Sequence, residues 1–249
     1  MSEVREEYTR ETYPSFGKKY NGEKAIISLT SWRARINTVS KTLFSLIQQC
    51  PGFHIVLVLS EEEFPKMCEE LPDNLMLFVE NEMIELLWVY KNYKSFKKVL
   101  FTMDKYRDVP VISADDDCIY TCNYAQELYD KWTENKNAIV SINKSNKNGY
   151  SYGPWGIATI HPIHNYDLEE KLYIFLNFLK YKNISSDDMF YGLYQIAIKH
   201  NPIISLNKKI KDIGIYENFY DTSISKANKN NYKENSNILY KAFNEIYKS

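Results

Sequence analysis

Short apolar runs alternate with segments of helical periodicity through the first half of the chain. Four runs are typical of buried strands, at residues 25–30, 53–59, 75–79 and 111–114. Apolar side chains also recur at helical spacing from Ile36 to Cys50 and from Phe96 to Tyr106. This alternation predicts an α/β fold, in which crossover helices join the strands of a mostly parallel sheet. The second half is less regular, with predicted strands at 138–142 and 157–160 and predicted helices at 168–181, 185–200 and 238–247.

The run that begins at Val111 ends in three consecutive aspartates, Asp115, Asp116 and Asp117. Three neighbouring anions repel one another, and their desolvation is costly unless a cation or hydrogen-bond donors compensate. Oxygen-rich sites of this kind suit Mg²⁺ or Mn²⁺, with phosphate oxygens as the remaining ligands. A solvated acidic turn is the alternative. Because ligands bind beyond the carboxyl ends of parallel strands, we expect residues 30–32 to share this edge with the aspartates.

A second acidic pair, Asp187 and Asp188, follows two serines where a helix is predicted. Acidic side chains in a first helical turn favour the helix dipole, so the pair has an ordinary structural explanation. If it faces the first cluster across a cleft, one acidic group can hold a metal while the other accepts a proton from an attacking hydroxyl. This combination of a metal site and a proton acceptor suits the transfer of a group away from a diphosphate, because the metal offsets the charge that develops on the leaving phosphate.

Composition excludes several other classes. The net charge is −1, from 31 basic and 32 acidic residues, which argues against a nucleic-acid binder driven by bulk charge. No run has the length of a membrane span, and the charged N-terminus lacks the apolar core of a signal peptide. The four cysteines match no disulfide framework, and we expect free thiols rather than a zinc site at Cys118 and Cys122. We therefore expect a cytoplasmic protein without a transmembrane segment.

The ordered motifs resemble those of bacterial nucleotide-sugar-dependent glycosyltransferases with a GT-A fold and a DxD motif. The matching pieces lie in the family's order, at residues 27–32 with Arg35 and Ile36, 94–98, 113–117 and 186–188. The resemblance implies a Rossmann-like, mostly parallel central sheet flanked by helices. It also implies a divalent cation, Mn²⁺ or Mg²⁺, and a sugar moved from a nucleotide diphosphate to a glycan hydroxyl, with inversion favoured.

The resemblance assigns roles to particular residues. Asp117 and Asp115 would hold the metal. Asp188 would be the general base, with Asp187 as the alternative, because the sequence Ser186-Asp187-Asp188 departs from the family's usual pattern. The acceptor wall would include Gly153, Trp155 and Gly156, although this segment has fewer glycines than the family's. His161 or His164 could complete the metal site, but ordinary structural histidines are the simpler interpretation. Donor-binding roles fall to Thr30, Ser31, Arg35, Lys98, Asp115 and Asp116.

The resemblance also divides the chain. Residues 1–24 would be an N-terminal arm and residues 25–206 the GT-A domain, with a nucleotide-sugar half at about 25–120 and an acceptor half at about 121–206. Residues 207–249 would be a C-terminal helical extension. The expected partners are a nucleotide-sugar donor and a glycan or lipid-linked glycan acceptor, with no nucleic acid. The expected setting is surface-polysaccharide or lipooligosaccharide assembly, with peripheral association at the inner face of the membrane left open.

Two other functions remain open at this point. A nucleotidyltransferase can use the same metal–phosphate edge, although such enzymes often carry a glycine-rich loop after the first strand, and no glycine lies between Gly22 and Gly52 here. A non-catalytic carbohydrate-binding protein on a degenerate transferase fold is the other alternative. Metal-dependent donor binding without turnover would distinguish it from an enzyme.

Overall fold

The structure is a computed structural model. It describes residues 12–147, 150–152, 157–163, 170–181, 187, 191, 194, 199–216, 237–238, 241–242 and 244–245. The predicted acceptor residues Gly153, Trp155 and Gly156 lie outside these ranges, as do Asp188 and His164.

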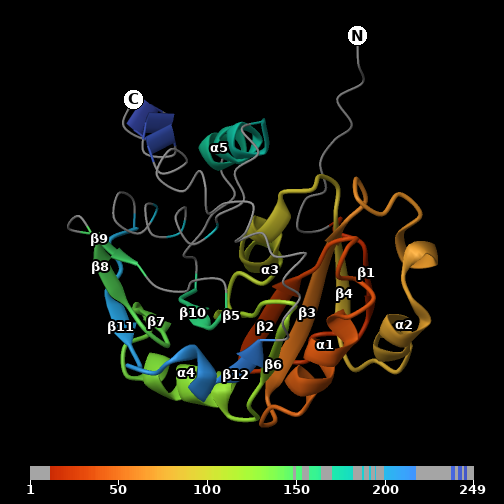
Figure 1. Cartoon of the computed structure of the whole chain (residues 1–249), viewed down its shortest axis with the longest axis horizontal. Helices are drawn as coiled ribbons and strands as arrows, with labels where there is room; N and C mark the ends of the chain where they lie inside the picture. The colour runs from red at the N-terminus through yellow and green to blue at the C-terminus, as the bar shows by residue number, and fades with distance from the viewer. Residues whose placement is uncertain are drawn as a thin grey trace.

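A central sheet organises the described part of the chain, with its strands in the order β1-β4-β3-β2-β5-β10-β7-β11. The neighbouring pairs β4–β3, β3–β2 and β2–β5 are parallel, whereas β10 runs antiparallel to both β5 and β7. Strand β11 returns parallel to β7. Helices flank both faces of the sheet (Figure 1). The predicted α/β class with a mostly parallel central sheet is therefore confirmed.

The helices and strands are short and follow one another closely. The strands of the large sheet are β1 (Ser15–Gly17), β2 (Ala25–Thr30), β3 (Phe53–Ser60), β4 (Glu85–Val89), β5 (Val111–Ser113), β7 (Ile139–Ser141), β10 (Thr159–His161) and β11 (Ile203–Ser205). Two small sheets pair β6 (Cys118–Tyr120) with β12 (Gly214–Tyr216) and β8 (Ser145–Lys147) with β9 (Tyr150–Tyr152). The helices are α1 (Val39–Ile47), α2 (Asp73–Glu80), α3 (Lys97–Lys105), α4 (Tyr124–Thr133) and α5 (Glu170–Tyr181).

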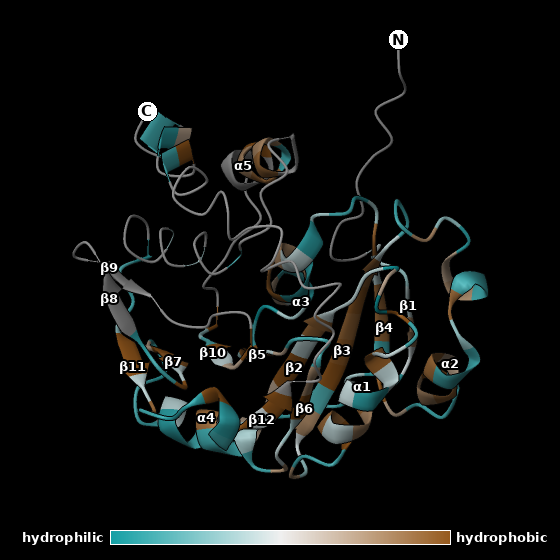
Figure 2. Ribbon diagram, viewed as in Figure 1, coloured by the Kyte–Doolittle hydropathy of each residue, from teal (hydrophilic) through white to brown (hydrophobic). Residues whose placement is uncertain are grey.

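The two faces of the sheet bury different helices because side chains alternate along each strand. On one face, Ile27 and Leu29 of β2 belong to a core cluster with residues of α1, α2 and α4. On the other face, Ile26 of the same strand belongs to a cluster with residues of α3 and α5. In Figure 2, strands β2, β3 and β4 are coloured mainly as hydrophobic, whereas the helices combine hydrophilic and hydrophobic residues. The part of the sheet around β2 is therefore packed on both faces, and the loops that follow β2 and β5 start from this packed core.

One predicted strand is wrong. Residues 75–79 belong to helix α2, and the strand of this βαβ unit is β4, ten residues further along. A five-residue apolar run does not by itself distinguish a buried helix from a strand. Here Leu75 and Val79, four residues apart, are the side chains of α2 that are buried, which is helical spacing.

Segments of the predicted N-terminal arm and of the predicted C-terminal extension pair with strands of the central part of the chain. Residues 15–17, within the predicted N-terminal arm, form β1 at the edge of the large sheet beside β4. Residues 214–216, within the predicted C-terminal extension, form β12 against β6. Backbone in helical conformation also occurs at residues 187, 191 and 194, and again within 237–245.

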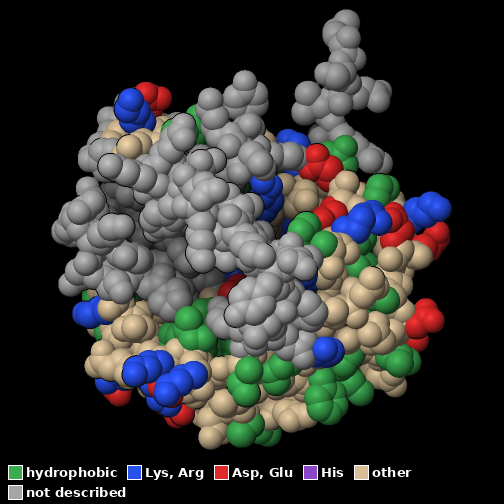
Figure 3. All heavy atoms as spheres, viewed as in Figure 1, with side chains coloured by type: hydrophobic (Ala, Val, Ile, Leu, Met, Phe, Trp, Pro, Cys, Tyr) green, Lys and Arg blue, Asp and Glu red, His purple; other side chains and the backbone are tan. Residues whose placement is uncertain are grey.

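The described surface carries mixed charge. In Figure 3, Lys and Arg side chains lie beside Asp and Glu side chains rather than gathering by sign, as the near-neutral net charge suggests. The four cysteines are free. No helix in the described ranges is both long and apolar enough to span a bilayer.

Candidate functional site

The three aspartates lie where the order of the strands reverses. Strands β2, β3 and β4 lie successively on one side of this point, and β5 lies on the other. The loop after β2 begins at Ser31, and the loop after β5 contains Asp115, Asp116 and Asp117. Because β2 and β5 are parallel neighbours, both loops leave the same edge of the sheet. In open α/β sheets this reversal point is where ligands bind.

Asp116 is the buried member of the three aspartates. Its Oδ2 accepts a hydrogen bond from Ser31 Oγ at 2.6 Å, and its Oδ1 accepts one from Arg35 Nη1 at 2.6 Å. The backbone carbonyl of Asp116 accepts a hydrogen bond from Thr42 Oγ1 at 3.0 Å. A carboxylate removed from water needs such donors. Asp116 therefore joins the loop after β5 to the loop after β2 and to helix α1.

Asp117 shares the same arginine but is more accessible. Its Oδ2 lies 3.0 Å from Arg35 Nη1. Burial and the negative charge of Asp115 raise the pKa of Asp117 to about 6, although the charge of Arg35 opposes that rise. Arg35 itself is buried. One guanidinium thus compensates two neighbouring carboxylates.

Lys98 connects the aspartate loop to the second acidic pair. Its Nζ lies 2.6 Å from Asp115 Oδ1 and 3.3 Å from Asp187 Oδ2. Burial raises the pKa of Asp187, as does the charge of Asp115, whereas Lys98 lowers it. The neighbouring Lys97 points elsewhere, and its Nζ donates to Asn92 Oδ1 at 2.6 Å. The structure therefore brings one aspartate of each acidic group, Asp115 and Asp187, close to the same buried ammonium.

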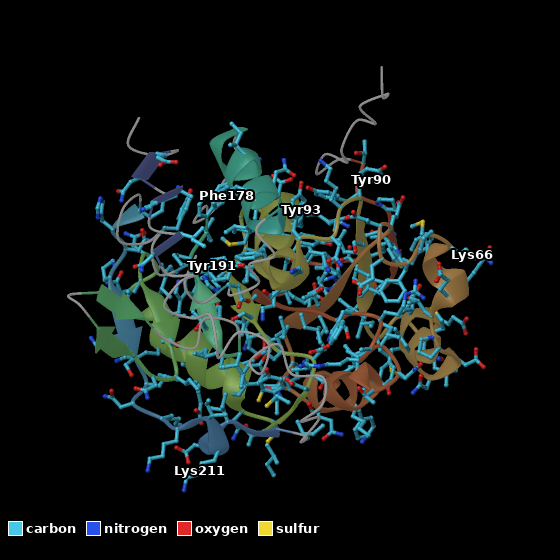
Figure 4. The ribbon with its side chains drawn as sticks, turned by 45° about the horizontal axis from the view of Figure 1, so that its top comes forward. Lys66, Tyr90, Tyr93, Phe178, Tyr191 and Lys211 are labelled. Carbon is cyan, nitrogen blue, oxygen red and sulfur yellow. The ribbon has the colours of Figure 1, made fainter. Side chains whose placement is uncertain are left out.

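Packing on the α3 face explains how Asp187 reaches this position. The hydroxyl of Tyr191, four residues after Asp187 in the sequence, donates to the Phe96 carbonyl at 3.4 Å, next to the start of α3. Tyr93, in the loop before α3, donates to Asn177 of α5 at 3.4 Å. Figure 4 shows Tyr93, Phe178 and Tyr191 on the same side of the sheet, around α3 and α5. Ser28 of β2 donates to the Lys98 carbonyl and so holds the first turn of α3 on the sheet.

Negative charge is in excess at this edge. Within the part of the chain that the structure describes, four carboxylates (Asp115, Asp116, Asp117 and Asp187) are opposed by two cations, Arg35 and Lys98. When all four carboxylates are ionised, a divalent cation would balance the charge that Arg35 and Lys98 leave uncompensated. The described residues contain no cluster of three or more His, Cys, Asp or Glu side chains able to hold a metal. A cation at this edge would therefore take at most two of its ligands from the described side chains of these types, and phosphate oxygens could supply the others, as they commonly do for Mg²⁺.

Two other residues with predicted roles, Thr30 and His161, lie at opposite edges of the sheet. Thr30, the last residue of β2, donates through Oγ1 to the Val58 carbonyl of β3 at 2.6 Å. His161 is buried and pairs with Val111, at the opposite end of β5 from the aspartates. Its ring lies 5.5 Å from that of Tyr191.

Three polar residues on the α1 side support the aspartate loop and the end of β6, and they were not predicted. Thr42 and Ser45 are buried in α1, and Gln49 follows its end. Ser45 Oγ accepts the Tyr120 N–H at 3.0 Å, and Gln49 Nε2 donates to the Thr121 carbonyl at 2.7 Å. Their spacing of three and four residues places them on one face of the helix. In the sequence, these polar residues lie beside the apolar positions Val39, Leu43 and Leu46, and this pattern could have identified them as buried polar groups.

Comparisons with known proteins show likeness to solved glycosyltransferase structures. No family model and no curated protein matches the sequence. GlyE from Streptococcus pneumoniae TIGR4 is 14% identical over 75% of this chain and 46% of its own, with a TM-score of 0.44. The mannosyltransferase PcManGT from Pyrobaculum calidifontis, in complex with GDP-Man and Mn²⁺, is 12% identical over 76% of this chain and 56% of its own, with a TM-score of 0.46. S. aureus TarS 1–349 is 12% identical over 90% of this chain and 66% of its own, with a TM-score of 0.48. The chain spans about half the length of GlyE and PcManGT. Structural similarity at TM-scores below 0.5 does not indicate the function of this chain.

Proposed function

We propose that this chain is a metal-dependent GT-A glycosyltransferase that moves a sugar from a nucleotide-diphosphate sugar to a glycan hydroxyl. The observation that carries the proposal is the excess of carboxylates over cations at the β2/β5 edge, where α/β folds bind ligands. A cation and the diphosphate that it chelates would complete such a site. The sequence resemblance names the same residues for the same roles.

Asp115 and Asp117 would hold Mn²⁺ or Mg²⁺ in this proposal. Asp116 is already bonded to Ser31 and Arg35, so its part is to fix the shape of the loop on the donor side. Thr30, Ser31, Arg35 and Lys98 would border the donor. In the structure, Arg35 and Lys98 are engaged by carboxylates, and we propose that they act on the donor largely through the aspartates that they hold.

The reaction divides between the two acidic groups. When bound, the cation would stabilise the negative charge that develops on the departing diphosphate. A carboxylate of the second pair, Asp188 or Asp187, would accept the proton of the acceptor hydroxyl. The hydroxyl oxygen would then form a bond to the anomeric carbon. The bond from that carbon to the diphosphate oxygen would break, and its electron pair would leave with the nucleoside diphosphate. In-line attack of this kind inverts the anomeric configuration.

The acceptor wall would include Gly153, Trp155 and Gly156, and the acceptor would be a glycan or lipid-linked glycan. The setting we propose is bacterial surface-polysaccharide or lipooligosaccharide assembly, on the cytoplasmic side and peripheral to the membrane. These assignments rest on the sequence resemblance.

Donor-induced stabilisation tests the proposal. A ligand that binds the folded state at 100 times its Kd adds about 2.7 kcal/mol to the free energy of unfolding. We expect a shift of this size with one family of nucleotide sugars, and only when Mn²⁺ is present. Asp117→Ala should abolish it, whereas Asp130→Ala, which removes an exposed carboxylate on α4, should retain it. A wild-type protein that no nucleotide sugar stabilises would overturn the proposal, and an unchanged shift in Asp117→Ala would overturn the metal assignment.

Turnover of the identified donor tests the base. Asp187→Asn and Asp188→Asn should each be compared with wild type at saturating Mn²⁺. Because general-base catalysis contributes about 10²–10⁴-fold, the base variant should lose that factor in kcat. Near-wild-type turnover in both variants would show that neither aspartate is the base.

A further inference from the structure

The hydroxyl of Tyr120 joins two separate segments of the site. Tyr120 ends β6, and its ring is buried and stacked on Tyr124, with ring centroids 4.3 Å apart and an interplanar angle of 28°. Its hydroxyl accepts the backbone N–H of Asp115 at 2.7 Å and donates to the carbonyl of Ile157 at 2.9 Å. The first partner lies in the aspartate loop. The second directly follows the predicted acceptor residues 153–156 in the sequence.

We infer that Tyr120 is a positioning residue, whose hydroxyl holds the Asp115 backbone in place for cation and donor binding and ties the aspartate loop to the backbone of Ile157. The inference rests on the proposed function for its effect on binding. The hydrogen-bonded tie itself does not depend on that function. Nothing in the sequence resemblance assigns a role to this tyrosine.

The bonds around the loop show why the hydroxyl matters. Ser31, Arg35 and Thr42 hold the side chain and carbonyl of Asp116, and none of these bonds reaches the Asp115 N–H. The N–H of Asp115 is bonded to Tyr120. Without the hydroxyl, this N–H and the Ile157 carbonyl would both lose a partner in a largely buried setting, which is unfavourable. The Asp115 backbone would then relax, and its carboxylate would move with it.

Through the Tyr120 hydroxyl, the backbone of Asp115 and the backbone of Ile157 are linked to each other. Tyr120 is itself held from the other direction, because its N–H donates to Ser45 Oγ on α1 and its ring packs on Tyr124 of α4. The hydroxyl is therefore a fixed point for two backbone segments 42 residues apart, counted from Asp115 to Ile157. A movement of the aspartate loop on donor binding would be transmitted to residue 157.

Tyr124 supplies a matched control. It is buried in the same ring stack, but its hydroxyl has no hydrogen-bond partner among the described residues. Tyr124→Phe and Tyr120→Phe thus delete the same atom from neighbouring tyrosines and keep both rings. Only Tyr120→Phe removes bonds to the aspartate loop and to Ile157. A difference between the variants therefore reports the contacts of the Tyr120 hydroxyl, which include the bonds to Asp115 and Ile157.

The first readout is hydrogen exchange, which needs no ligand. In the wild type the Asp115 amide should be protected. In Tyr120→Phe we expect exchange at Asp115 to rise about tenfold or more, because local opening no longer breaks a hydrogen bond there. Peptides that cover residue 157 should report the same loosening, and Tyr124→Phe should match the wild type at both places. An unprotected Asp115 amide in the wild type overturns the inference, even if Tyr120→Phe does not fold. Equal exchange in the two variants also overturns it.

The second readout is calorimetric titration with Mn²⁺ and either UDP or GDP, well below the unfolding temperature. Two lost hydrogen bonds predict a Kd about 5- to 30-fold higher for Tyr120→Phe and unchanged for Tyr124→Phe. A purely structural tyrosine would lower thermal stability and leave the Kd of the folded protein unaltered, which would overturn the positioning role. If the wild type binds neither nucleotide, the proposed function fails, while the exchange data still decide whether Tyr120 holds the loop.

Discussion

Glu85, at the first position of β4, should give the protein a stability that is lost in acid. The residue lies at the opposite end of the sheet from the aspartates, and its side chain is 2% exposed. Its Oε2 lies 2.7 Å from His54 Nε2, its Oε1 lies 2.5 Å from Lys105 Nζ, and Tyr106 donates to it through its hydroxyl. We consider the substitution Glu85→Gln, which keeps the shape and removes the charge.

The magnitude follows from the pKa of Glu85. Burial alone raises this pKa, but the hydrogen bond from His54 and the charge of Lys105 outweigh burial, and the pKa falls from 4.5 to about 2. A shift of about 2.5 units corresponds to roughly 3 kcal/mol in the free energy of unfolding. Because the folded-state pKa is the lower one, this contribution is complete above about pH 4.5 and is lost as the pH falls toward 2. About 2 kcal/mol of it should be gone by pH 3.

Urea unfolding of wild type, Glu85→Gln and Glu80→Gln at pH 7 and pH 3 measures the effect. Wild type should exceed Glu85→Gln by about 3 kcal/mol at pH 7 and by about 1 kcal/mol at pH 3. Glu80→Gln, the same change at an exposed position of α2, should stay within about 0.5 kcal/mol of wild type at both values. A difference between wild type and Glu85→Gln that is the same at both pH values would refute the reasoning.

Two further substitutions test the site and its support. Lys98→Met leaves Asp115 and Asp187 without their shared ammonium, so the free energy of unfolding should fall by about 3 kcal/mol. Saturating Mn²⁺ should stabilise the variant more than it stabilises wild type. A loss below about 1 kcal/mol, measured by chemical denaturation, would contradict this expectation. Gly214→Ala would place a Cβ 2.5 Å from Cys118 Sγ and 2.8 Å from the Ile119 carbonyl, which should cost about 1–3 kcal/mol by thermal unfolding. Cys118→Ala in the same chain should recover part of that loss, and strictly additive effects would show that the crowding is not at the sulfur.

The strand pattern shows how far local sequence determines this fold. The runs predicted as strands at 25–30, 53–59 and 111–114 form β2, β3 and β5, although β5 ends at Ser113, because apolar runs of this length bury well in a parallel sheet. Strand β4 escaped prediction because its first residue is a glutamate. That charge is stabilised by His54 and Lys105, which lie 31 and 20 residues away and form no local pattern with it.

The sequence by itself determined that three aspartates end a buried strand, that a hydroxyl-bearing loop follows the neighbouring strand, and that the chain alternates strands with helices. These features are local, since each depends on the order and spacing of residues within one or two elements. Only the tertiary structure decided how the aspartates are used. Ser31 and Arg35, which bond to Asp116, lie 85 and 81 residues from it in the sequence. The Tyr120 hydroxyl bonds to the carbonyl of Ile157, 37 residues further along the chain. Such bonds form because packing brings buried polar groups together and each one then requires a partner, whatever its distance along the chain.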